Sequence, residues 1–134
     1  MKNSKAIGKK LYENLGKLFY AIAKADSRVH GKEISKLRSF IRKYWLEVDG
    51  LEDEFGTDAA FQIESVFDWS MENNLDSEVC YESFKEFYKD NGGLFTAFIK
   101  VLILDTAHAI SNSFAGKNKA ELVMLGKLEL LLKK

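Results

Sequence analysis

The sequence contains no proline, one cysteine and no apolar run long enough to cross a membrane. An average chain of this size carries about 5% proline, mostly in turns and at strand edges, so its absence favours long helices joined by Gly, Asn and Asp turns. Cys80 has no second cysteine with which to form an internal disulfide, which favours a reducing compartment. The N-terminus lacks the continuous apolar core of a secretory signal. We therefore expect a cytoplasmic protein that is not an integral membrane protein.

The sequence also lacks net charge, with 20 Lys and Arg against 20 Asp and Glu, which argues against a general nucleic-acid binder. The charges are nevertheless segregated: residues 1–48 carry a balance of +8, residues 49–90 one of −11 and residues 91–134 one of +3. Solvated helix faces of opposite sign are the favoured interpretation. The alternative is that the acidic segment 49–90 steers an oppositely charged partner.

Apolar residues recur at steps of three and four, which predicts amphipathic helices throughout and no strands. The expected helices span 4–25, 31–45, 57–73, 76–90, 94–114 and 118 to the C-terminus, with an acidic connector at 49–56. Helix 94–114 is apolar nearly all round, which predicts that it lies at the centre of the bundle. The aromatic residues fall at core spacing. The expected fold is a single all-α domain, residues 1–134, a bundle of six or seven helices.

The junction between the first two helices, residues 25–33, contains the first candidate site. Asp26 leaves one helix and Glu33 lies in the first turn of the next, so their carboxylates would converge on a hard cation, with Ser27 as a further oxygen ligand. The loop lacks the dense Asp/Asn alternation of a calcium loop. In the structural alternative, Asp26 closes a turn, Val29 enters the core and Glu33 binds the amides at the helix start.

The run from Leu18 to Ile41 resembles the first motif of TerB-like proteins, the group of tellurite-resistance proteins and DjlA N-terminal domains. That motif consists of an apolar helix that ends in Ala-Asp-Gly, a β-branched residue, and a second apolar helix that begins with Glu. The residues that match it are Ala25, Asp26, Val29, Glu33, Leu37 and Ile41. Ser27 stands where the family usually has glycine. The resemblance implies an all-α fold of two pseudo-symmetric halves and a role in tellurite or another stress response, beside a membrane-associated protein partner.

The second half of such a fold would correspond to residues 109–128. Glu121 and Leu122 align with Glu33 and Ile34, but no aspartate stands at the counterpart of Asp26. Asn112 or Asn118 would be an uncharged and weaker substitute. The departure puts a second cation site in doubt and leaves the implied architecture intact.

The second candidate site is the sequence Asp105-Thr-Ala-His108, with Asn112 one turn further on. These three positions share one helix face, and carboxylate-x-x-His is also the spacing of di-metal helical bundles. A buried Asp–His pair that hydrogen-bonds across the bundle is the favoured interpretation, followed by a functional polar stripe. A metal-dependent enzyme would additionally require carboxylates such as Glu64 or Asp68 beside them.

Together these patterns predict a non-enzymatic binding or scaffold protein with a protein partner. The metal or partner contact would lie at Asp26 and Glu33, with Ser27 and His30 as accessories, and the cofactor would be a divalent cation. Two alternatives stay open: a metal-dependent enzyme using Asp105 and His108, and a metal-free interaction module that binds through segment 49–90. Cys80 lies in an acidic helix, which predicts a raised thiol pKa and little reactivity.

Overall fold

The computed structural model describes residues 2–24, 57–112 and 119–133, together with Ser35, Ser39, Lys43 and Trp45. This part of the chain contains five α-helices and a short 3-10 helix, and no strand. In chain order they are α1 (Lys2–Ala23), α3 (Thr57–Glu72), α4 (Ser77–Asp90), η2 (Gly92–Leu94), α5 (Ala97–Asn112) and α6 (Lys119–Leu132). The all-α helical bundle is therefore confirmed. None of the described helices is both long and apolar enough to span a bilayer.

Short polar residues set the helix ends, as the sequence predicts. The Asp76 carboxylate accepts a hydrogen bond from the Val79 amide at 3.0 Å and caps α4. Asn74 turns the chain between α3 and α4 with a positive φ of 49°, a conformation that asparagine tolerates better than most residues. Helix α5 begins at Ala97 rather than at residue 94 because Gly92–Leu94 forms η2 and Thr96 then caps the new helix, accepting from the Ile99 amide at 3.2 Å.

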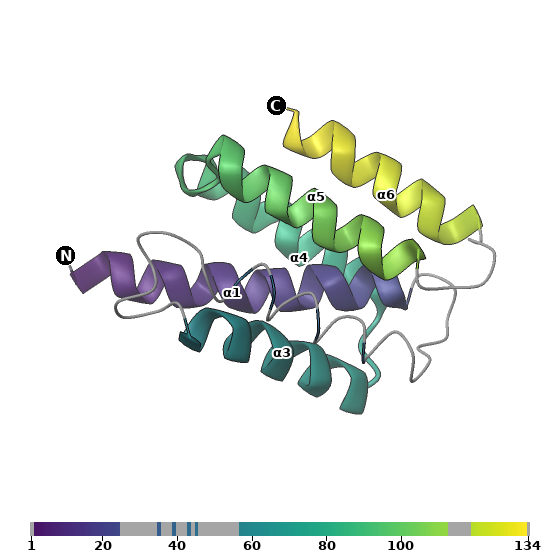
Figure 1. The fold of residues 1–134 in the computed structure, drawn as a ribbon, viewed down its shortest axis with the longest axis horizontal. Helices are drawn as coiled ribbons and strands as arrows, with labels where there is room; N and C mark the ends of the chain where they lie inside the picture. Colours follow the sequence, from purple (N-terminus) through teal and green to yellow (C-terminus); the bar gives the residue numbers. More distant parts are fainter. Residues whose placement is uncertain are drawn as a thin grey trace.

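Helix α1 is the central element of the bundle. It packs against α3, α4, α5 and α6, and Figure 1 shows α3 on one side of α1 with α5 and α6 on the other. All six residues from Leu18 to Ala23 are buried. The prediction that helix 94–114 occupies the centre is wrong, because α5 has an exposed side, which includes Phe98 and Val101.

Helices α1 and α3 approach each other closely at Gly16. A Cβ atom at this position would lie 2.8 Å from the Ile63 carbonyl oxygen and 2.8 Å from Val66 Cβ, so only glycine permits this approach of α1 to α3. One turn further along, the Tyr20 ring meets the Phe67 ring edge-on at 6.0 Å. The Tyr20 hydroxyl donates to the Leu75 carbonyl at 2.9 Å. These contacts hold α3 in place and so determine which of its sides faces solvent.

A buried polar contact joins Trp45 to α5. The Trp45 indole Nε1 donates to Thr106 Oγ1 at 3.1 Å, and that hydroxyl donates to the Leu102 carbonyl at 2.7 Å. Both side chains are fully buried, and each of their polar atoms has the hydrogen-bond partner that a buried polar group requires. The Trp45 ring also lies 6.4 Å from the Phe19 ring of α1. Trp45 is therefore a core residue shared by α1 and α5.

Aromatic rings close the end of the bundle where α4 leads into η2. Phe95 lies edge-on to Tyr88 at 4.7 Å and to Phe84 at 5.9 Å between ring centroids. Edge-on pairs of this kind add about 0.5–1.5 kcal/mol to the burial of the rings themselves. The cluster fixes the short connection between α4 and α5.

Candidate functional site

The residues of the first predicted site, Asp26, Ser27, His30 and Glu33, lie outside the described residues. The same holds for Asn118, the candidate substitute in the second half. The cation site at this junction, and the pseudo-symmetry that the family resemblance implies, therefore stay predictions.

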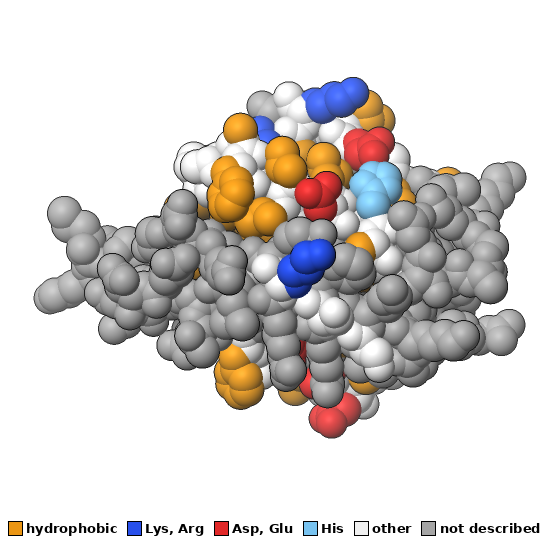
Figure 2. Space-filling view, viewed as in Figure 1, with side chains coloured by type: hydrophobic (Ala, Val, Ile, Leu, Met, Phe, Trp, Pro, Cys, Tyr) orange, Lys and Arg blue, Asp and Glu red, His pale blue; other side chains and the backbone are white. Residues whose placement is uncertain are grey.

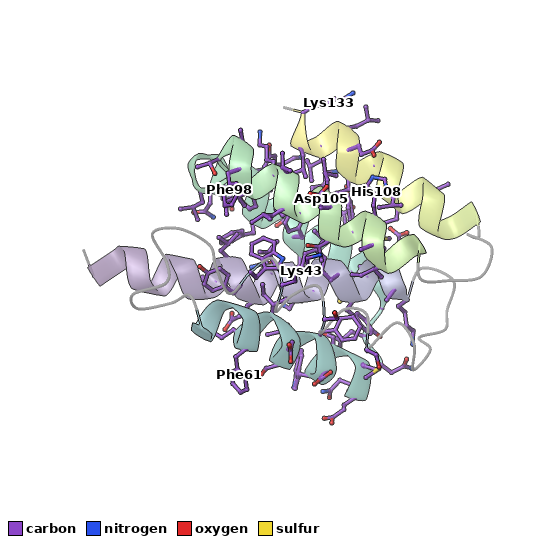
Figure 3. The ribbon with its side chains drawn as sticks, in the orientation of Figure 1. Lys43, Phe61, Phe98, Asp105, His108 and Lys133 are labelled. Carbon is purple, nitrogen blue, oxygen red and sulfur yellow. The ribbon has the colours of Figure 1, made fainter. Side chains whose placement is uncertain are left out.

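The second predicted site is present on α5, but in a different form. Asp105 is exposed, so the prediction of a buried Asp–His pair is wrong. The reason is its position: Asp105 follows exposed Val101 by one turn, whereas Ile103, Thr106 and other core residues occupy the opposite side of α5. Asn112 is the last residue of the helix. Figure 3 shows Asp105 and His108 on the same helix, with His108 directed toward α6.

His108 pairs with Glu129 of α6, a partner that the sequence prediction missed. The His108 Nε2 atom lies 2.9 Å from Glu129 Oε2, and the two side chains are 41% and 46% exposed. Glu129 and Lys127 are the only charged residues between Leu122 and Leu132, and this isolation in an apolar helix is the signal that would have identified Glu129. The pair joins α5 to α6 at the surface, where such pairs contribute little to stability.

The structure does not unite Asp105 and His108 with the carboxylates that the enzyme alternative requires. Glu64 and Asp68 lie on α3, which is separated from α5 by the central helix α1 (Figure 1). Among the described residues, no three His, Cys, Asp or Glu side chains are close enough together to hold a metal ion.

Cys80 is buried in α4, where burial raises the pKa of its thiol. Asp76 adds to this effect, and Lys17 opposes it. The predicted direction is confirmed, although loss of solvent rather than the acidic helix is the main cause. A neutral, buried thiol is a poor nucleophile.

The outer side of α3 combines two exposed aromatic residues with one exposed acidic residue, and the sequence prediction missed it. Phe61 is 68% exposed and Trp69 is 52% exposed. Ser65, also exposed, lies between them at helical spacing, and Glu72 continues the line. Figure 3 shows Phe61 pointing away from the bundle. We call these four residues the outer face of α3. The opposite side of α3, which includes Ile63 and Phe67, is buried against α1.

The acidic charge of segment 49–90 is divided between two helices. Four exposed carboxylates, Glu78, Glu82, Glu86 and Asp90, lie on α4, where the exposed large apolar residue is Val79. Helix α3 carries four acidic residues, Asp58, Glu64, Asp68 and Glu72, and no Lys, Arg or His. Among the described side chains, the exposed aromatic rings of α3 thus lie beside one exposed carboxylate, Glu72, whereas α4 has several exposed carboxylates and no exposed aromatic residue.

A second set of exposed apolar side chains lies on α5 and α6. Phe98 and Val101 are more than half exposed on α5, as are Val123 and Leu130 on α6. Figure 2 shows hydrophobic side chains gathered over α5, with acidic side chains and a histidine beside them. Lys100 of α5 lies 5.7 Å from the Tyr88 ring centre, and Lys127 of α6 lies 3.7 Å from Glu78. This region thus carries charges of both signs and has no single electrostatic preference.

Comparison of the chain with protein-family models, with curated proteins and with solved structures gave no match. The resemblance of residues 18–41 to TerB-like proteins therefore remains an inference from the motif alone.

Proposed function

We propose that this chain is a non-enzymatic binding or scaffold protein that recognises a protein partner through the outer face of α3. The observation that carries the proposal is the pair of exposed aromatic residues, Phe61 and Trp69, on a helix with four acidic and no basic residues. Aromatic residues that are solvent-exposed and spaced on one helix face are typical anchors of protein interfaces. Burying either ring against a partner would remove apolar surface that the fold itself leaves in water.

The exposed carboxylate of Glu72 beside these rings favours a partner with a positive group at that position. Opposite charge accelerates the encounter and selects among partners, while the apolar anchors supply most of the affinity. This role corresponds to the acidic interaction module among the sequence-based alternatives, and it assigns the contact to α3 rather than to the whole of segment 49–90.

The experiment is affinity capture with the full chain from cells that express it, followed by mass spectrometry. The test variant is Phe61→Ser with Trp69→Ser, and the matched control is Phe98→Ser, which alters an equally exposed ring on α5. We expect a partner that binds the original chain and the control but not the test variant. Capture of the same proteins by all three would contradict the proposal.

The TerB-like resemblance adds a second, separable element to the proposal: a scaffold of two helical halves that acts in tellurite or another stress response and binds a divalent cation at Asp26 and Glu33. Support comes from the motif in residues 18–41. Thermal melting with calcium, magnesium, manganese or zinc tests the cation contact, because an ion that binds only the folded state raises the melting temperature. Asp26→Asn should abolish that rise, and no rise with any of the four ions would refute the cation contact.

A further inference from the structure

We draw no further inference here: the strongest candidate, the set of exposed apolar side chains on α5 and α6 that includes Phe98, Val101, Val123 and Leu130, lies among charges of both signs, and nothing in the structure shows what covers it.

Discussion

Helices α1 and α5 differ in apolar composition and in burial, and the more apolar helix is the less enclosed one. Helix α5 is the more apolar of the two, yet part of its surface, including Phe98, faces solvent. Helix α1 carries lysines along much of its length, yet it is enclosed by four other helices and is buried at every position from Leu18 to Ala23. The difference teaches that the centre of a small bundle belongs to the helix that can be contacted on all sides, and not to the helix with the most apolar residues.

The last two turns of α1 explain this outcome. Six consecutive residues there, Leu18-Phe19-Tyr20-Ala21-Ile22-Ala23, are apolar or aromatic, so neighbours can pack on every side. Gly16, just before them, allows α3 to approach closely. On α5, Asp105 and His108 interrupt the outward side and keep it at the surface. The surplus apolar residues of α5 therefore remain exposed.

The largest expected effect compares truncation of a core leucine in α1 with truncation of an exposed valine in α5. Leu18→Ala removes a fully buried side chain and should lower the free energy of unfolding by about 2–5 kcal/mol. Val101→Ala alters a half-exposed residue and should change it by no more than about 0.5 kcal/mol. Urea unfolding followed by circular dichroism measures both. Similar losses in the two variants would show that α5 is as central as α1.

The second comparison concerns two glycines in helices. Gly16→Ala should destabilise the fold by about 1–3 kcal/mol, because the new methyl group would meet the Ile63 backbone and Val66. Gly126→Ala in α6 meets no atom within 4 Å and should stabilise the fold by about 0.5–1 kcal/mol through helix propensity. The same unfolding measurement decides the signs. A stabilising Gly16→Ala would mean that α1 and α3 are not closely packed.

The pH dependence of the free energy of unfolding tests whether Tyr12 of α1 is buried. Burial raises its pKa to about 12 from the ordinary 10.0, so at high pH the unfolded chain loses this proton first and gains stability relative to the folded one. The free energy of unfolding should be unaffected below pH 10 and fall as the pH rises from about 10 to about 12. Tyr81 of α4 is raised to about 12 as well, so Tyr12→Phe should reduce the loss without abolishing it.

A second measurement on Tyr12→Phe concerns the stability of the fold at neutral pH. The Tyr12 hydroxyl is buried with no hydrogen-bond partner among the described residues, so its removal should be neutral or stabilising by about 1 kcal/mol. A destabilising Tyr12→Phe would reveal a partner for the hydroxyl.

The smallest expected effect concerns the His108–Glu129 pair on the exposed side of α5. Because both side chains are nearly half exposed, Glu129→Gln should lower the free energy of unfolding by less than about 1 kcal/mol. A double-mutant cycle with His108→Gln isolates the contribution of the contact. A coupling of several kcal/mol would mean that this pair, and not the core around α1, holds α5 and α6 together.

Local features of the fold could be predicted from the sequence because they depend on neighbouring residues. The break at residues 73–75, the Asp76 cap and the ends of α3 and α4 lie within a residue or two of their predicted positions. The raised pKa of Cys80 was also predicted in direction. Capping and helical periodicity act over one or two turns, so the chain reveals them without knowledge of its packing.

Features that join distant segments could not be predicted in this way. The sequence pairs His108 with Asp105 by spacing, but the structure pairs it with Glu129, 21 residues away. The aromatic residues as a group fall at core spacing, but this general pattern did not show that Phe61 and Trp69 of α3 are exposed. The choice depends on which helix side finds a neighbour, which is a property of the assembled bundle.

The sequence by itself determined that the chain is helical, where several helices begin and end, and that negative charge is concentrated in its middle. Those properties follow from backbone and side-chain preferences that act within a few residues. Only the tertiary structure decided that α1 is the centre and that Phe61 and Trp69 remain outside it. Side chains at a close-packed helix interface must fit together. Here Gly16 and the buried last turns of α1 determine which side chains fit.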